Sequence, residues 1–327
     1  FGTSSHHGKG PGSTIEYETL CSFGTLCLNE NIESIIMAND ICNRYDIDTI
    51  SAGSTIAFAI ECYENQLITA QDTEGIKLNW GNHQAIVAMT EKLAKREGFG
   101  TILADGVKIA AEKIGKGASK YSFHIHGQEI PMHDPRFAPS FATAYQVDAT
   151  PARHTQASLG YIEEGSPPFP GTEVGLPSLD KYTYTGKGHL EAMFRNRLHL
   201  VNASGICMQT FFFSLPFETL FAFLSAVTGW KLSLRELDKT GERIAAIRQA
   251  FNVREGLTPE DFKLQGRPAG KPPLEQGPNA NISVDTSTLR KEYFRAMSWD
   301  PKTGKPSKSK LKELELFDII EDLYSQD

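Results

Sequence analysis

Residues 31–65 read NIESIIMANDICNRYDIDTISAGSTIAFAIECYEN, and this stretch decides the fold class. Apolar residues recur at helical spacing over 31–45 and again over 54–65, with a polar turn between the two segments. Asn29 or Asn31 can cap the first helix, because an Asn oxygen accepts hydrogen bonds from first-turn amides. The same spacing predicts further helices at residues 83–96, 101–114, 189–201, 215–228, 234–251 and 309–324.

Few other segments show a regular pattern. Strand signals are weak and occur only at 122–130 and near Tyr182. Residues 115–188 are rich in Pro, Gly, His and aromatic side chains, which is typical of long functional loops. A second loose region spans 268–285. We therefore predict a mostly α chain of two helical lobes with a loop-rich central segment, divided into domains 1–122 and 123–327.

Composition bounds the function. The 327 residues suggest about two domains at roughly 150 residues each. A net charge of −7 argues against a general nucleic-acid binder, since phosphate neutralisation needs a basic face. An uninterrupted run of about 18 apolar residues is lacking, so no membrane span is expected. Five cysteines without paired spacing favour a reducing compartment, and we expect a cytoplasmic protein.

Two short turns share a pattern at expected helix ends. Asn43 to Asp48 and Asn202 to Cys207 both read Asn-x-x-(Asp or Gly)-Ile-(Asp or Cys). Two related turns could hold two halves of one polar ligand. Solvated helix ends and a chance resemblance are the alternatives, and the residues alone leave all three open. Nucleotide-binding, hydrolase and zinc-protease motifs are lacking.

Histidines gather in the middle of the chain, where His133 lies in PMHDPRF and His154 in ATPARHTQ. Imidazole titrates near neutrality and suits proton transfer, although a single His is more often structural. His124 and His126 could suggest zinc, but further ligands at typical spacing are lacking. Near the start, Tyr17 and Glu18 precede an apolar segment, which is also typical of an ordinary helix entry.

Six blocks in a fixed order carry a family resemblance. They are EYETL (16–20), NDICNRYDIDTISAG (39–53), ILADGVKIAAEKIG (102–115), GQEIPMHDPR (127–136), YQVDATPARH (145–154) and NASGIC (202–207). In this order they resemble the aldehyde ferredoxin oxidoreductase family. The resemblance implies a tungsten bis-pterin, or a molybdenum one as in some relatives, and one 4Fe–4S cluster. It also implies a β-rich N-terminal domain and two helical domains, of which this chain resembles only the helical pair.

The resemblance assigns cofactor residues to the two turns. In the family, paired Asp-x-x-Gly-Leu-(Cys or Asp) turns hold the pterins. The matching residues here are Asn43, Asp48, Asn202, Gly205 and Ile206. Both leading Asp positions are Asn in this chain, and Asp46 replaces the first Gly. An Asn side chain can still hydrogen-bond a pterin.

Cys207 matches the family's fourth cluster cysteine, and its three partners come from a Cys-x-x-Cys-x-x-x-Cys run that this chain lacks. The chain therefore cannot hold the cluster by itself. Because it also begins with Phe1 and not with Met, we expect these residues to be part of a longer protein. A Glu that binds a bridging metal at a dimer interface in some relatives is Met37 here, so that site is not expected.

The resemblance also implies chemistry. Glu18 matches a glutamate near the metal, with Tyr17 beside it, and His154 matches an active-site histidine. His133 stands where better-known relatives have Tyr. The implied reaction oxidises aldehydes to carboxylic acids and passes electrons to ferredoxin or another carrier. Reduction of aromatic acyl-thioesters and an incomplete helical fragment or scaffold without cofactor are the alternatives. The oligomeric state stays open, and a homo-oligomer is compatible with the sequence.

Overall fold

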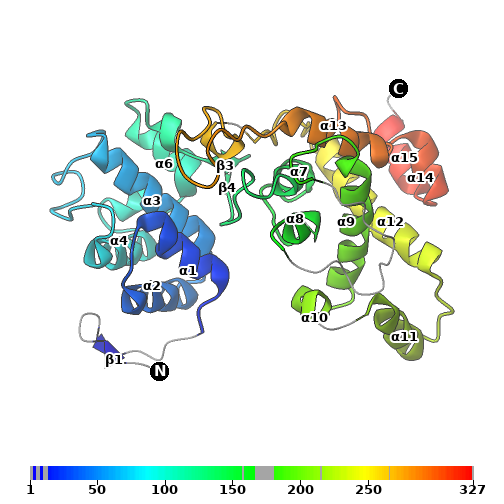
Figure 1. Cartoon of the computed structure of the whole chain (residues 1–327), viewed down its shortest axis with the longest axis horizontal. Helices are drawn as coiled ribbons and strands as arrows, with labels where there is room; N and C mark the ends of the chain where they lie inside the picture. Colours follow the sequence, from blue (N-terminus) through cyan, green and yellow to red (C-terminus); the bar gives the residue numbers. More distant parts are fainter. Residues whose placement is uncertain are drawn as a thin grey trace. The chain divides into compact units, whose positions relative to one another are not determined.

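The computed structural model describes residues 3–4, 8–9, 14–156, 158–165, 180–213, 216–264 and 266–325 (Figure 1). The chain is mostly helical, as predicted. It forms two compact units, Phe1–Met132 and His133–Asp327. The division expected after residue 122 lies just before the first hairpin strand of the central segment.

The first unit is built from short helices around one long helix. Its elements are β1 (Thr3–Ser4), β2 (Gly8–Lys9), α1 (Tyr17–Phe23), η1 (Thr25–Cys27), α2 (Ile32–Arg44), α3 (Thr49–Glu64), α4 (His83–Lys95), α5 (Gly100–Leu103), α6 (Gly106–Ile114), η2 (Ala118–Tyr121), β3 (His124–Ile125) and β4 (Gln128–Glu129). α3 packs against α1, α4 and α6, and nine of its residues are buried. A helix that is buried on most sides needs little amphipathic pattern.

α3 begins at Thr49, so the start expected at residue 54 was wrong. Asp48 caps this helix by accepting a hydrogen bond from the Ser51 N–H at 2.7 Å. Asp at an N-cap satisfies an amide that has no partner inside the helix. The polar residues read as a turn are therefore the first turn of α3.

Gly53 brings α1 close to α3. A Cβ at Gly53 would lie 2.6 Å from the Ser22 Cβ, well inside van der Waals contact. Ser22 also donates a hydrogen bond to the Thr49 carbonyl at 3.0 Å. The small residue at position 53 therefore sets the position of the helix that carries Tyr17 and Glu18.

The weak strand signal at 122–130 corresponds to a small antiparallel hairpin, β3–β4, in which His124 faces Glu129. His126 and Gly127 both have positive φ, of 51° and 94°, which matches the turn that favours tight hairpins. The Glu129 carboxylate accepts the Val107 N–H at 2.7 Å, at the start of α6. α6 is separate from α5, so the single helix expected over 101–114 is two helices in the structure.

The second unit is arranged around α9. Its elements are α7 (Ser140–Val147), α8 (Ser158–Glu163), α9 (Lys187–Ala203), α10 (Met208–Phe213), α11 (Phe217–Thr228), α12 (Leu234–Arg254), η3 (Arg267–Ala269), α13 (Thr286–Ala296), α14 (Lys308–Glu313) and α15 (Phe317–Tyr324). α9 packs against α12 and α13 and also contacts α7 and α8 (Figure 1). A Cβ at Gly241 of α12 would lie 1.9 Å from the Asn196 carbonyl oxygen of α9. Glycine therefore permits the close approach of these two helices.

Several predictions for this unit need correction. Residues 115–188 were expected to be irregular but include α7 and α8, and α13 was not expected. Residues near Tyr182 form a turn and not a strand, since the Tyr182 N–H bonds to the Asp180 carboxylate. The helix expected over 309–324 is divided into α14 and α15. The helix start expected at residue 215 lies outside the described residues.

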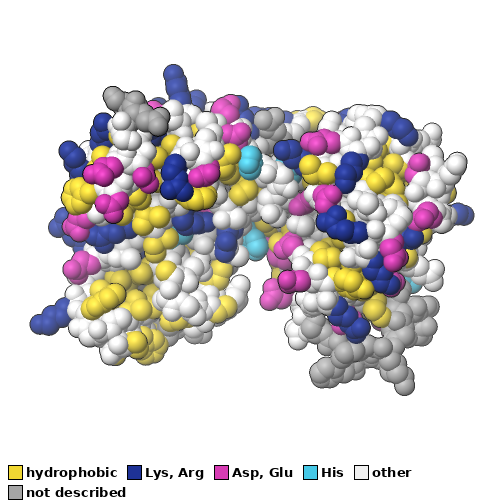
Figure 2. All heavy atoms as spheres, turned by 180° about the vertical axis from the view of Figure 1, so that it is seen from behind, with side chains coloured by type: hydrophobic (Ala, Val, Ile, Leu, Met, Phe, Trp, Pro, Cys, Tyr) yellow, Lys and Arg dark blue, Asp and Glu magenta, His cyan; other side chains and the backbone are white. Residues whose placement is uncertain are grey.

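The surface mixes charges of both signs. Figure 2 shows Lys and Arg side chains interspersed with Asp and Glu across one face, without a continuous basic field there. Within the residues described, no helix is both long and apolar enough to cross a membrane.

Candidate active site

The first turn of α1 holds Tyr17 and Glu18, and both side chains bind one backbone residue far along the chain. The Tyr17 hydroxyl donates to the Met132 carbonyl at 2.8 Å. The Glu18 carboxylate accepts the Met132 N–H at 2.9 Å. The end of the first unit is thus tied to the first turn of α1, and Glu18 is partly buried.

His133, the first residue of the second unit, is held on several sides. Its side chain is 8% exposed, and its ring stacks on Phe141 with centroids 4.6 Å apart. Nδ1 lies 3.0 Å from both carboxylate oxygens of Glu164. The Tyr145 hydroxyl donates to the His133 carbonyl at 2.9 Å. Ring and backbone of His133 are therefore both fixed.

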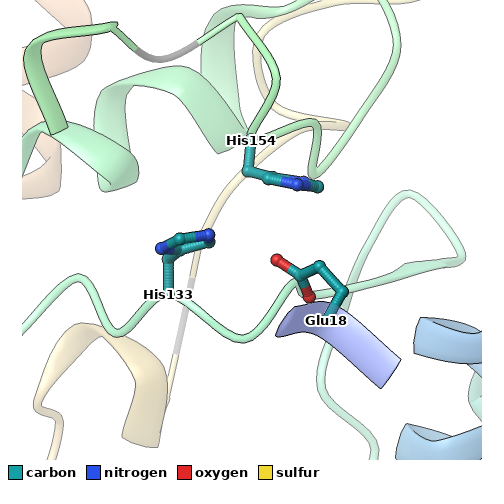
Figure 3. Close-up of side chains that lie close together, drawn as sticks. All are labelled: Glu18, His133 and His154. Carbon is teal, nitrogen blue, oxygen red and sulfur yellow. The ribbon is translucent and has the colours of Figure 1, made fainter. Parts of the chain in front are cut away.

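His154 lies beside His133 within the same unit. The two imidazole rings stack with centroids 5.3 Å apart and an interplanar angle of 28° (Figure 3). The two histidines predicted from separate sequence blocks are thus brought together. An imidazole can accept, hold or donate a proton, so the pair is chemically suited to proton transfer.

The loop that carries His154 is fastened by a buried guanidinium. Arg195 of α9 is 1% exposed and donates to Asp148 at 2.6 Å and to the Gln156 carbonyl at 2.8 Å. These two partners lie on either side of His154 in the sequence. One arginine therefore pins both ends of the loop, and planar guanidinium groups suit such paired contacts.

A second arginine reinforces the loop. Arg248 of α12 donates to the Asp148 carboxylate at 2.7 Å and to the Thr150 hydroxyl at 2.9 Å. Asn252 donates to the Ala149 carbonyl at 2.8 Å. Burial alone would raise the pKa of Asp148, but Arg195 and Arg248 outweigh it, so this pKa lies below its usual value. Asp148 is therefore an anion at neutral pH.

The same region contains two buried groups that sequence reasoning missed. Burial, assisted by the charge of Arg195, lowers the pKa of His199 to about 3, so His199 is neutral at pH 7. Burial also raises the pKa of Glu191 to about 8. Among the described residues, neither Glu191 oxygen has a hydrogen-bond partner. Glu191 and Arg195 are four residues apart in α9, a spacing visible in the sequence but uninformative without knowledge of burial.

The two turns singled out in the sequence have similar backbones. Asn43 lies in the last turn of α2 and Asn202 in the last turn of α9, and both residues are exposed. Three residues later, Asp46 and Gly205 have positive φ of 57° and 75°. An Ile and then the residue before the next helix follow in each case, Asp48 before α3 and Cys207 before α10. Asp tolerates the left-handed conformation better than most side chains, which explains how it can replace Gly.

The cysteines differ sharply in accessibility. Burial raises the pKa of Cys27, Cys42 and Cys62 to about 12, and all three are buried in the first unit. Cys21 is half-buried with a raised pKa, mainly from burial. Cys207 alone of the five is exposed. A thiol that is neutral and enclosed is a poor metal ligand.

Comparison with known proteins identifies the family. The family model for aldehyde ferredoxin oxidoreductase, domains 2 and 3, matches residues 2–316. The chain belongs to the aldehyde ferredoxin oxidoreductase family. It is 30% identical over 309 residues to the tungsten-containing aldehyde ferredoxin oxidoreductase of Pyrococcus abyssi, covering 93% of this chain and 49% of the relative. It therefore spans about half the length of that relative.

Other family members and neighbours differ in what they act on. The WOR-like subunit of the aliphatic sulfonate oxidoreductase of Pyrococcus furiosus is 25% identical over 314 residues, covering 91% of this chain and 45% of that protein. The solved BamBC complex of benzoyl coenzyme A reductase with 1,5-dienoyl-CoA superposes with a TM-score of 0.71 and 19% identity. That match covers 98% of this chain and 52% of the neighbour, and it supports the fold.

The residues of this chain fit the pterin of the family better than they fit its 4Fe–4S cluster. Each turn presents an exposed Asn amide, which both donates and accepts hydrogen bonds and so suits a pterin edge. A 4Fe–4S cluster usually takes four thiolates. Only Cys207 is exposed, while three of the other cysteines are enclosed with pKa values of about 12. The five cysteines of this chain therefore do not fit a complete cluster.

Proposed function

We propose that the protein is an oxidoreductase that binds a tungsten or molybdenum bis-pterin and oxidises aldehydes to carboxylic acids. The family match over residues 2–316 carries this proposal. The reaction takes an aldehyde and water and yields a carboxylic acid, two protons and two electrons. Ferredoxin or another electron carrier is the proposed acceptor.

The pterin would be held at the two turns. The proposed residues are Asn43, Asp48, Asn202, Gly205 and Ile206. Their support is the matched sequence pattern and the shared backbone, with a left-handed residue three positions after each Asn. Asp48 already accepts the Ser51 N–H, so its second oxygen and the turn amides are the groups proposed to face the ligand. When bound, the metal supplies the redox centre that accepts two electrons.

The chain's own side chains would manage the protons. We propose that His154 accepts a proton as water adds to the carbonyl and that Glu18 orients the carbonyl or shares in the transfer. His133 would serve beside His154, with which it stacks at 5.3 Å. Tyr17 would support Glu18 by fixing the Met132 backbone that both contact. The clamped loop supports this role, because general acid–base catalysis needs a fixed geometry.

Cys207 is proposed as one cluster ligand, on the strength of its exposure and its place after the second turn. The remaining ligands would come from outside the cysteines of this chain, and no electron-transfer step is derived through the cluster. Five free cysteines are consistent with the cytoplasmic location that we propose.

The test uses the full-length gene product. We expect tungsten or molybdenum to copurify and aldehyde to reduce a viologen dye. His154→Ala should lower kcat by about 100-fold or more with unchanged metal content. His189→Ala is the matched control, because His189 lies exposed on α9 and should leave kcat unaltered. Full activity in His154→Ala, or absence of both metals, would contradict the proposal. An aromatic acyl-thioester and an aliphatic sulfonate complete the substrate panel. Turnover of either one without aldehyde oxidation would contradict the proposed substrate class and assign the enzyme to that substrate.

A further inference from the structure

The Glu164 carboxylate contacts only one ring nitrogen of His133. Both of its oxygens lie 3.0 Å from Nδ1. An ionised carboxylate can only accept hydrogen bonds, so Nδ1 must carry the proton in this pair. In a neutral imidazole the other nitrogen is then the acceptor. The contact therefore selects one tautomer, with Nε2 as the basic atom.

The surroundings hold the ring so that this selection matters. Phe141 and His154 both stack on the imidazole, and Tyr161 meets it edge-on with centroids 5.4 Å apart. A ring confined in this way cannot readily turn over to exchange its two nitrogens. Stacking thus fixes the plane of the ring, and Glu164 fixes which nitrogen bears hydrogen.

Glu164 is itself mounted on a rigid support. It follows α8 directly, and its N–H bonds to the Gly160 carbonyl at 3.0 Å. The side chain of the preceding residue, Glu163, is 7% exposed, accepts the Ser140 N–H at 2.8 Å and pairs with Lys187 at 2.6 Å. Glu164 is 23% exposed and has no such anchoring contacts to Ser140 or Lys187. The two neighbouring glutamates therefore have different contacts. Glu163 fixes the end of α8, and Glu164 faces His133.

We propose that Glu164 is a positioning residue that sets the Nδ1–H tautomer of His133 and presents Nε2 for proton transfer. This inference rests on the proposed function, because it assigns His133 a part in the reaction. A carboxylate that accepts the N–H of a functional histidine fixes both the tautomer and the orientation of the ring. Glu164 acts only through His133, and this dependence separates it from a residue that merely stabilises the fold.

Two measurements test the proposal. Nitrogen-15 histidine NMR of the purified protein reads the tautomer directly, with His133 assigned from its loss in His133→Phe. We expect a protonated Nδ1, which Glu164→Met should abolish. A neutral ring with hydrogen on Nε2 in the unaltered protein would overturn the proposal, even if the variant failed to fold. This readout is independent of turnover, so an inactive protein with the expected tautomer would count against the proposed function alone.

The second measurement is a double-mutant cycle in kcat. Glu164→Met should lower kcat by about 10- to 100-fold, with a smaller effect on KM. His133→Phe retains a ring to stack on Phe141 but has no nitrogen for Glu164 to contact. In that background, Glu164→Met should cause no further loss. An equal loss in both backgrounds would show that Glu164 acts independently of His133 and would overturn the proposal.

Discussion

Glu191 offers the sharpest test of the buried charges in the second unit. Its side chain is 1% exposed, and the Arg195 guanidinium lies 3.8 Å from its carboxylate oxygen. Burial is the main cause that raises its pKa to about 8, and Glu163 adds to the shift while Arg195 opposes it. The folded protein therefore keeps this carboxyl protonated at pH 7. We consider the substitution Glu191→Gln, which preserves size and removes the titration.

The sign of the pH effect follows from proton uptake. An unfolded Glu releases its proton near pH 4.5, whereas the folded one holds it until about pH 8. Between these values the folded state binds more protons, so the free energy of unfolding falls as pH rises. The slope is about 1.4 kcal/mol per pH unit, and the whole interval of roughly 3.5 units amounts to about 4–5 kcal/mol. This stabilisation is complete below pH 4.5 and lost above pH 8.

Urea unfolding measures this contribution at pH 5, 6, 7 and 8. Among these 327 residues, replacement of Trp80 and Trp230 by Phe leaves Trp299, which is buried in the second unit, as the fluorescent reporter. As pH rises, the free energy of unfolding of Glu191→Gln should increase relative to that of the parent protein by about 1 kcal/mol per pH unit. The control Glu218→Gln, at an exposed position on α11, should show a difference that does not vary with pH. A pH-independent difference for Glu191→Gln would mean that the buried carboxyl is ionised and would refute the reasoning.

Three further substitutions or labelling experiments address the scaffold. Gly53→Ala should destabilise the first unit by about 1–3 kcal/mol in urea unfolding, because the new methyl group overlaps Ser22, and an unaltered midpoint would contradict the close approach. Arg195→Met leaves a buried carboxylate without its main partner and should cost about 3–5 kcal/mol, with faster tryptic cleavage after Arg153 in the released loop. A thiol reagent at pH 8 should modify Cys207 rapidly while the three buried cysteines react only after unfolding, and rapid native labelling of all five would show that their burial is wrong.

The periodicity of apolar residues predicted the helices that have one solvent-exposed face. α2, α4 and α12 agree closely with the predicted ranges because each presents an apolar stripe to a core and polar residues to water. Ser233 and Glu236 form a capping box that fixes the start of α12, and such a cap is readable from the sequence. Local signals were sufficient where helix position depends on local contacts.

Two of the missed helices, α7 and α8, lack such a stripe. All eight residues of α7 are buried, including Thr143 and Gln146, so its polar residues do not mark a solvent face. Gln146 instead bonds the Ala142 and Thr286 carbonyls. α8 is only six residues long, too short for a helical period to be recognised. Partners distant in sequence determine these segments.

The residues of the candidate site also fall into a predicted group and an unpredicted group. His133 and His154 were predicted from their sequence blocks, and the stack of their rings shows that they are neighbours. Glu164 and Arg195 were not predicted, because an acid after a short helix and an arginine within a helix are ordinary sequence features. Their roles depend on contacts 31 residues away for Glu164 and 47 residues away for Arg195.

α9 connects the two kinds of site within the second unit. Its middle supplies Arg195, which pins the His154 loop, and its C-terminal end leads into the turn from Asn202 to Ile206. Because Gly241 of α12 allows a helix–helix approach that any side chain would block, α9 has little freedom to slide or rotate. A substitution that displaced α9 would therefore disturb both the His154 loop, which is proposed to handle protons, and the proposed pterin turn. Loss of both functions from one distant change would reflect this shared support and would not by itself identify a catalytic residue.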